Sequence, residues 1–211
     1  MKPMCITFTG ADREDLIPDM VKLSKIYPVE WGILFSPANQ GKKPRYPAPS
    51  MITRLFDKHL MLSAHLCGKH SRDVMAGKEP DLPVSLQFFK RIQVNSREPN
   101  VEKILALPNP GQRCIAQTRG EFSMDDRIWW LYDCSGGRGE MPKRWPSHPG
   151  EGRLVGFAGG LRPDNVEDAL KALEPTEPYS PYWIDMESGV RSPDNVFDIN
   201  LCREVCERVY G

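Results

Sequence analysis

Two matched segments between Leu154 and Arg191 decide the fold. The first reads Leu154-Val155-Gly156-Phe157-Ala158-Gly159-Gly160-Leu161-Arg162-Pro163-Asp164-Asn165-Val166, and the second reads Tyr182-Trp183-Ile184-Asp185-Met186-Glu187-Ser188-Gly189-Val190-Arg191. Each begins as an apolar run typical of a buried strand, reaches glycine, and continues into a predicted helix. Glycine lets backbone N–H groups approach a ligand, and a helix N-terminus favours an anion. Two such loops side by side are typical of the phosphate site of a (β/α)8 barrel. The sequence therefore predicts a phosphorylated small-molecule ligand, bound by Gly159, Gly160, Ser188 and Gly189.

Composition limits the class of protein. The chain has 211 residues, which suits a single barrel domain over residues 1–211, and 28 basic residues balance 28 acidic ones. Nothing in that balance indicates nucleic acid or an anionic membrane as a partner. No apolar run approaches the roughly 20 residues of a membrane helix, and no signal-peptide core is recognisable. The 6 cysteines show no disulfide spacing, so we expect reduced thiols in a cytoplasmic protein.

The upstream chain supplies the remaining strands of the predicted barrel. Apolar runs with strand character occur at Met4–Thr9, Trp31–Phe35, Leu60–Leu66, Arg91–Asn95, Cys114–Gln117 and Ile128–Asp133. Asp12 is expected to cap the first helix, and the last helix is predicted from about Pro193 to Val209. The connection from Thr118 to Arg127 is short, which predicts that one helix is missing between strands five and six.

Some polar clusters allow two interpretations. The loop from Ser36 to Pro49 carries Lys42, Lys43 and Arg45, and such a loop either lines the site or is a solvated, positively charged segment. His65, Cys67 and His70 follow the third strand, but no fourth metal ligand lies nearby, so we interpret them as barrel-interior residues. Cys202 and Cys206 share one helical face with apolar residues and are predicted to be core. We expect neither a metal nor a cofactor.

Asp133 ends the apolar sixth strand and precedes the glycine-rich loop Cys134-Ser135-Gly136-Gly137-Arg138-Gly139. Catalytic acids of barrel enzymes lie at the C-terminal ends of strands. A helix cap is the alternative, but a glycine-rich loop is a poor helix start. Asp133 is therefore the candidate catalytic acid.

These motifs together resemble the phosphoribosylanthranilate isomerases of tryptophan biosynthesis. The segment Gly159 to Val166 is similar to the family's glycine-glycine-leucine, proline, asparagine-valine signature, and Asp185 to Val190 is similar to its aspartate-valine-serine-serine-glycine-valine segment. Asp133, followed by Gly136 and Gly137, falls where the family has its general acid and a glycine loop. Arg45 resembles an anthranilate-binding position, and the strand with Gln93 and Asn95 resembles the family's glutamine-leucine-histidine strand.

The resemblance implies an Amadori rearrangement, in which an aminoaldose phosphate becomes a 1-amino-ketose. An acid, Asp133 here, protonates the ring oxygen and opens the furanose, and a base then removes the C2 proton. Arg45, Gln93, Asn95, Asp185 and Gly137 become candidate substrate-binding residues on the same ground.

The base is where this sequence departs from the family. The family has cysteine and glycine at the end of the first strand, and this chain has Thr9-Gly10. Cys5 is about 13 Å further down that strand, so it cannot substitute. Cys67-Gly68, two strands away, is the replacement considered, because Lys69 and His70 would lower the pKa of its thiol.

Three hypotheses follow. The first is an isomerase acting on a phosphorylated sugar or aminosugar, as a monomer or homodimer. The second is a phosphosugar-binding barrel that has lost its base and its activity. A third, aldol cleavage through a Schiff base, is disfavoured because no lysine lies in the sixth strand.

Overall fold

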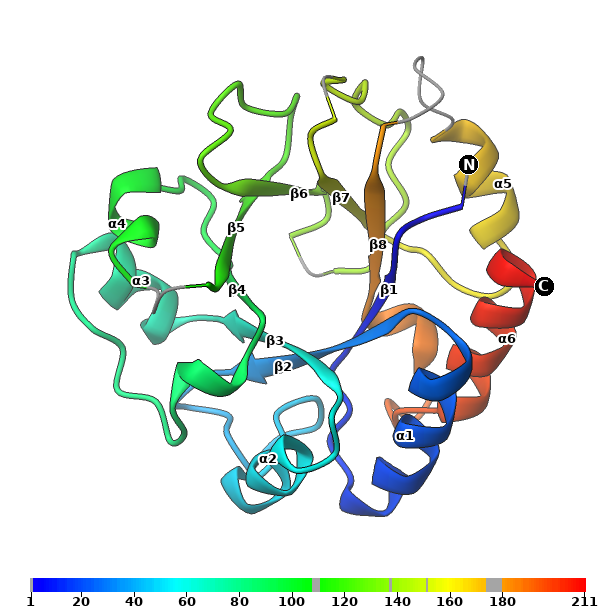
Figure 1. Cartoon of the computed structure of the whole chain (residues 1–211), viewed down its shortest axis with the longest axis horizontal. Coiled ribbons are helices and arrows are strands. Elements are labelled where there is room, and N and C mark those ends of the chain that lie inside the picture. The colour runs from blue at the N-terminus through cyan, green and yellow to red at the C-terminus, as the bar shows by residue number, and fades with distance from the viewer. Residues whose placement is uncertain (1, 108–110, 137, 151, 174–179) are drawn as a thin grey trace.

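Eight parallel strands close into a barrel in the computed structural model, which describes residues 2–107, 111–136, 138–150, 152–173 and 180–211. Strands pair in chain order, and β8 pairs with β1 to complete the ring. Figure 1 shows the ring with helices and loops outside it. The predicted (β/α)8 barrel is confirmed. The strands are β1 (Ile6–Thr9), β2 (Val29–Phe35), β3 (Met61–Leu66), β4 (Arg91–Val94), β5 (Arg113–Thr118), β6 (Trp129–Asp133), β7 (Val155–Ala158) and β8 (Tyr182–Met186).

The outer layer has fewer helices than an eightfold barrel would allow. Residues 119–128, between β5 and β6, contain no helix, as predicted. The described residues between β6 and β7 contain none either, which the sequence analysis did not predict. Pro142, Pro146 and Pro149 explain this second gap, because proline removes a helical hydrogen bond and clashes with the preceding turn. Within the described residues the α-helices are α1 (Ile17–Ile26), α2 (Pro49–Phe56), α3 (Lys69–Met75), α4 (Val101–Leu105), α5 (Val166–Ala172) and α6 (Ile199–Tyr210).

Aromatic side chains cover the strands where these helices are missing. Phe122, from the β5–β6 connection, packs edge-on against Phe157 of β7, with ring centroids 5.4 Å apart. Trp145, from the β6–β7 connection, lies 5.8 Å from both Phe157 and Tyr132. These contacts bury the outer face of β6 and β7 without a helix.

Two predicted helix starts are wrong. Asp12 does not cap α1; its Oδ2 accepts hydrogen bonds from the Arg45 backbone N–H at 2.5 Å and from Arg191 Nη2 at 2.8 Å. The last helix begins at Ile199 because Arg191 and Phe197 form an antiparallel bridge upstream of it. Both differences tie loops together at the same end of the barrel.

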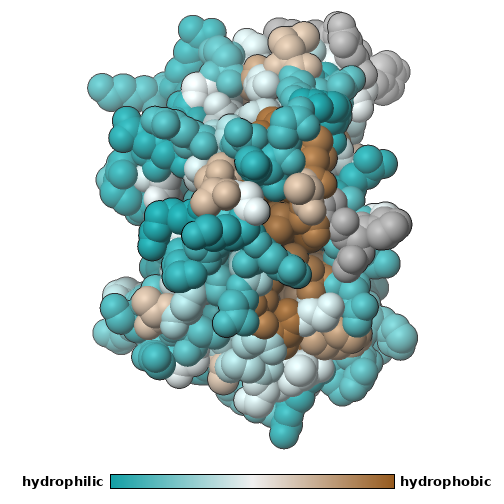
Figure 2. Space-filling view, turned by 90° about the vertical axis from the view of Figure 1, so that its left-hand side faces the viewer, coloured by the Kyte–Doolittle hydropathy of each residue, from teal (hydrophilic) through white to brown (hydrophobic). Residues whose placement is uncertain are grey.

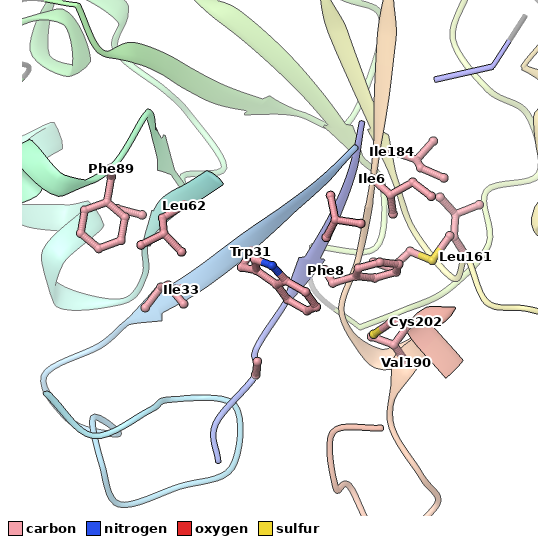
Figure 3. Close-up of a cluster of buried hydrophobic side chains, with 14 of the residues drawn as sticks. Ile6, Phe8, Trp31, Ile33, Leu62, Phe89, Leu161, Ile184, Val190 and Cys202 are labelled. Atoms are coloured by element: carbon pink, nitrogen blue, oxygen red, sulfur yellow. The ribbon is translucent and has the colours of Figure 1, made fainter. Parts of the chain in front are cut away.

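The main apolar core lies between the strands and the helices. Successive strand residues point to opposite faces, so Ile6 and Phe8 of β1 face outward while Thr7 and Thr9 face the barrel interior. Figure 3 shows Phe8 and Trp31 side by side in this layer, with Cys202 of α6 close to Val190. Cys202 and Cys206 are fully buried, so their prediction as core residues is confirmed.

The barrel interior below the mouth is held by a buried ion pair. Arg91 Nε donates to Glu30 Oε2 at 2.6 Å, and Arg91 Nη2 donates to Thr7 Oγ1 at 3.0 Å. The guanidinium also lies over the Trp183 ring, 4.5 Å from its centroid. Removing one partner of such a pair leaves a buried charge uncompensated, which typically costs about 3–5 kcal/mol. This layer lies beneath the mouth of the barrel.

The face that carries α3 and α4 shows a strip of hydrophobic residues among hydrophilic ones (Figure 2). Beside these helices runs a groove of about 770 Å³, whose apolar lining includes Val74, Leu82, Val84, Leu86 and Leu107. None of the predicted site residues lies in it. No helix in the described part of the chain is long and apolar enough to cross a membrane.

Candidate active site

A pocket of about 340 Å³ opens at the C-terminal ends of the strands, the face on which barrel enzymes carry their sites. Its volume lies within the range of small-molecule sites. All eight strands contribute side chains to it, namely Thr9, Leu34, His65, Gln93, Gln117, Asp133, Ala158 and Asp185 in strand order. The loops add two arginines, Arg97 and Arg119, at the β4 and β5 side.

The predicted phosphate residues all line this pocket. Gly159 and Gly160 follow β7, and Ser188 and Gly189 follow β8. Gly159 and Gly160 have positive φ angles of 122° and 65°, which favour glycine. Asn165 Nδ2 donates to the Gly160 carbonyl at 2.9 Å and so fixes the first loop.

Neighbouring backbone atoms also leave no room for a side chain at Gly160 and Gly189. A Cβ on Gly160 would lie 2.5 Å from the Met141 backbone nitrogen, and a Cβ on Gly189 would overlap the Leu161 carbonyl oxygen. Substitution of either glycine would therefore disturb the packing of the protein even when no ligand is bound. The second loop also continues into a 3-10 turn, Ser188–Val190, rather than into the predicted α-helix.

Asp133 ends β6 inside the pocket and is buried. Its Oδ1 accepts hydrogen bonds from Ser135 Oγ at 2.7 Å and from the backbone N–H groups of Ser135 and Gly136 at 3.1 Å each. One carboxylate oxygen thus caps the tight turn after β6, although no helix follows. The two interpretations of Asp133 are therefore compatible, because the same turn fixes the carboxylate at the pocket wall.

Asp185 lies at the same level of the barrel as Asp133. Both residues are in register with Ala158 of the intervening strand, so their backbones are two strand spacings, about 10 Å, apart. Asp185 Oδ1 accepts a hydrogen bond from Thr9 Oγ1 at 2.9 Å. Burial raises the pKa of Asp185 to about 8, and nearby Glu187 and Glu30 act in the same direction.

His65, Gln93 and Asn95 continue this polar arrangement across the pocket. Gln93 Nε2 lies 3.3 Å from His65 Nδ1 and donates to Asn95 Oδ1 at 2.9 Å. Burial, with a contribution from the positive charge of Arg91, lowers the pKa of His65 to about 3, so the imidazole is neutral near pH 7. His65 Nε2 is buried and has no hydrogen-bond partner among the described residues.

Burial of Cys67 opposes the expected activation of its thiol. Lys69 forms an ion pair with Asp73 at 2.5 Å, and burial raises the pKa of the Cys67 thiol to about 12. Its sulfur accepts from Asn95 Nδ2 at 3.3 Å. Cys67 lines the pocket as a neutral thiol because it is buried, and the nearby Lys69 ammonium is paired with Asp73 on α3.

Arg45 does not line the pocket. Its Nη1 donates to Glu187 Oε1 at 2.5 Å and to Ser188 Oγ at 3.1 Å, and its Nε donates to Asn195 Oδ1 at 3.2 Å. In this arrangement it holds the loop after β8 instead of facing a substrate ring. Among the loop residues from Ser36 to Pro49, Tyr46 is the one that lines the pocket. Gly137, also predicted, lies outside the described residues.

Sequence reasoning missed the role of three lining residues, His65, Glu187 and Tyr46. The alternation of Ser63, His65 and Cys67 along one strand predicts that His65 points into the barrel, but it does not indicate a role at the mouth. In the part of the chain that the structure describes, no group of three His, Cys, Asp or Glu residues is placed to hold a metal ion.

A closed parallel barrel with a polar pocket at this end has the architecture of (β/α)8 enzymes. No family model and no curated protein matches the sequence. Solved structures do match, and several of them are phosphoribosylanthranilate isomerases. The enzyme from Thermus thermophilus is 19% identical with a TM-score of 0.65, over 97% of this chain and 98% of that chain. TrpF from Jonesia denitrificans is 18% identical with a TM-score of 0.67, over 99% and 97%. A third, in complex with reduced 1-(o-carboxyphenylamino)-1-deoxyribulose 5-phosphate, is 14% identical with a TM-score of 0.64, over 99% and 98%.

Similarity at these identities establishes the fold. The chain therefore has the fold of the phosphoribosylanthranilate isomerases over nearly its whole length, which confirms the resemblance seen in the sequence motifs at the level of structure.

Proposed function

We propose that this protein is an aldose–ketose isomerase of the phosphoribosylanthranilate isomerase type, which rearranges a phosphorylated aminopentose into a 1-amino-ketose. The observation that carries the proposal is the pair of buried carboxylates, Asp133 and Asp185, which flank Ala158 at one level of the pocket. The rearrangement needs an acid at the ring oxygen and a base at C2, on different sides of one sugar. Two carboxylates about 10 Å apart at their backbones leave room for a pentose between them.

The two glycine loops support a phosphate at one end of that sugar. Gly159, Gly160, Ser188 and Gly189 form adjacent parts of the pocket rim on the β7 and β8 side. This is the position of the phosphate site in barrels that take phosphorylated ligands.

A second anionic end of the substrate would face the opposite rim. Arg97 and Arg119 line the pocket where the β4 and β5 loops meet it. Guanidinium groups bind carboxylates through paired hydrogen bonds. A substrate with a phosphate at one end and a carboxylate at the other, such as N-(5-phosphoribosyl)anthranilate, matches this distribution of charge.

In the proposed reaction Asp133 donates its proton to the furanose oxygen, the bond from C1 to that oxygen breaks, and an iminium ion forms between C1 and nitrogen. Loss of the C2 proton then gives an enolamine, which becomes the ketose when C1 is protonated and the C2 hydroxyl loses its proton. The turn at Ser135 and Gly136 holds the Asp133 carboxyl group in place for the first step.

Two measurements on the purified chain test the proposal. Calorimetry with ribose 5-phosphate, and with ribose as the control, reports the phosphate site; we expect binding only of the phosphorylated sugar. Incubation with N-(5-phosphoribosyl)anthranilate, followed by NMR, reports isomerisation. Turnover supports the enzyme, binding without turnover favours the phosphosugar-binding alternative, and absence of both contradicts the proposal.

A further inference from the structure

The proposed reaction requires a base, and the pocket offers few groups that could act as one. Thr9 occupies the end of the first strand, and a hydroxyl does not accept a proton near pH 7. Burial raises the pKa values of both Cys67 and Cys5 to about 12, so neither thiol is ionised at neutral pH. Among the carboxylates that line the pocket, Glu187 is ion-paired with Arg45 and Asp133 is assigned to the acid. Asp185 remains.

Asp185 is positioned by the residue that replaces the expected base. Thr9 Oγ1 donates to Asp185 Oδ1 at 2.9 Å across the junction between β1 and β8. This hydrogen bond orients the carboxyl group toward the end of the first strand, where the base is expected from the sequence motifs. Asp185 is 7% exposed, and it lines the pocket, so a substrate in the pocket can reach it.

A neutral hydrogen-bond donor lies next to this pair. A Cβ on Gly32 would lie 2.3 Å from Thr9 Oγ1 and 3.0 Å from His65 Nε2, so the hydroxyl and the imidazole approach the same point. The Gln93 side-chain nitrogen lies between His65 Nδ1 and Asn95 Oδ1, and it donates to both. Nδ1 is then an acceptor, which places the ring proton on Nε2. That N–H is buried and unpaired among the described residues, and His65 lines the pocket.

We propose that Asp185 is the base that removes the C2 proton, that Thr9 positions it, and that His65 Nε2–H donates a hydrogen bond to the C2 oxygen. The inference rests on the proposed isomerase function and completes its mechanism. The C2–H bond breaks and its proton goes to the Asp185 carboxylate. The electron pair forms the C1–C2 double bond, and the iminium π pair returns to nitrogen. Asp185 then returns the proton to C1, while the C2 hydroxyl releases its own proton to water.

The chemistry of both groups suits these roles. A general base works best with a pKa near the working pH, and burial holds the pKa of Asp185 at about 8. A carboxylate base combined with a neutral imidazole donor is a combination that isomerases of this fold use. His65 stays neutral because burial keeps its pKa near 3, so it can donate from Nε2 without delivering a charge.

Burial sets the direction of the pKa shift of Asp185, and the ionisable groups around it modify that shift. These groups are Cys5 beside β1, Glu30 on β2, His65 on β3, Arg91 on β4, Asp133 on β6 and Glu187 beside β8. The hydrogen bond from Thr9 lowers the pKa of Asp185. We therefore expect kcat/KM to rise as the pH increases through about 8 in the wild type, and the Thr9→Val variant to shift this rise to higher pH.

The test is steady-state kinetics with N-(5-phosphoribosyl)anthranilate on five proteins: wild type, Asp185→Asn, Thr9→Val, Thr9→Ser and Asp19→Asn. Asp19 on α1 pairs with Lys22 and lies outside the pocket, so it is the matched control. We expect Asp185→Asn to lower kcat about 10³-fold with little change in KM. Thr9→Ser, which keeps the hydroxyl, should restore the wild-type pH profile that Thr9→Val loses.

A second pair of variants tests His65 as the hydrogen-bond donor. His65→Leu should lower kcat about 10²-fold, while His65→Gln, which keeps an N–H group, should recover part of it. If the wild type turns over and Asp185→Asn stays within about threefold of it, the base assignment is overturned while the isomerase stands. An unshifted pH profile in Thr9→Val would also overturn the assignment of Asp185 as the base, even if Asp185→Asn failed to fold. A wild type that binds ribose 5-phosphate without turnover overturns the isomerase itself, and the base assignment with it.

Discussion

Thr9 and Asp185 are joined by a 2.9 Å hydrogen bond across the seam where the last strand of the barrel meets the first. The residue that stands where a catalytic cysteine is expected therefore touches a buried carboxyl group. The Thr9 hydroxyl supplies a donor that lowers the pKa of Asp185. This side-chain contact therefore joins the first and last strands at the level of the pocket.

The first prediction concerns stability and needs no substrate. The pKa of Asp185 is raised from 3.8 to about 8, so the native state keeps a proton that the unfolded chain releases above pH 4. Wild-type stability therefore falls as pH rises from about 4 to about 8, relative to a variant without this carboxyl group. Relative to the wild type, Asp185→Asn should gain on the order of 5 kcal/mol between pH 4 and pH 8, since about 1.4 kcal/mol accompanies each tenfold change in the protonation equilibrium. Chemical unfolding at both values measures this, and a difference independent of pH would contradict the buried, protonated carboxyl group.

The second prediction separates the two tasks of Asp133. An asparagine oxygen can still accept from Ser135 and Gly136, whereas alanine cannot. Asp133→Asn should lower kcat about 10²- to 10⁴-fold and leave ribose 5-phosphate affinity within about threefold. Asp133→Ala should also lose stability, by about 1–3 kcal/mol, because buried donors are left unpaired. Normal turnover in Asp133→Asn would remove Asp133 from the mechanism.

The third prediction concerns the cationic rim. If Arg119 binds the substrate carboxylate, Arg119→Gln should raise KM for N-(5-phosphoribosyl)anthranilate about tenfold. The affinity for ribose 5-phosphate, which lacks that group, should not change. Arg203→Gln on the exposed side of α6 is the control. Equal effects of Arg119→Gln on both ligands would place the carboxylate elsewhere.

The fourth prediction concerns Cys67. Burial raises the pKa of its thiol to about 12, so the reactive thiolate is scarce at pH 7.5. In the folded protein, iodoacetamide should modify Cys67 at least 100-fold more slowly than in urea, as followed by mass spectrometry of the Cys67 peptide. Rapid modification of the folded chain, suppressed by ribose 5-phosphate, would restore Cys67 as a candidate base.

The glycine-ended strands were the most predictable part of the molecule. The predicted strand over Tyr182–Met186 matches β8, and the neighbouring prediction over Leu154–Ala158 matches β7 within one residue. In both segments, the end of the apolar run and the glycines that follow it mark the end of the strand in the sequence. Helix starts were less predictable, because Asp12 and the bridge between Arg191 and Phe197 act through contacts with distant loops.

The interior of the barrel could not be read from the sequence. Glu30 and Arg91 are 61 positions apart, and a single charged residue in an apolar strand does not identify its partner. The same limit applies to the site. Thr9 was recognised as a departure from the family, but its contact with Asp185 depends on closure of the ring by β8. The neutral state of His65 follows from burial, which the sequence does not show.

The most direct test of the central claim is NMR of N-(5-phosphoribosyl)anthranilate incubated with the wild-type chain in D2O. We predict formation of the 1-amino-ketose, with deuterium or the transferred C2 proton at C1, at a rate that rises with pH up to about 8. Saturated binding of the substrate with no ketose and no exchange at C2 would contradict the claim.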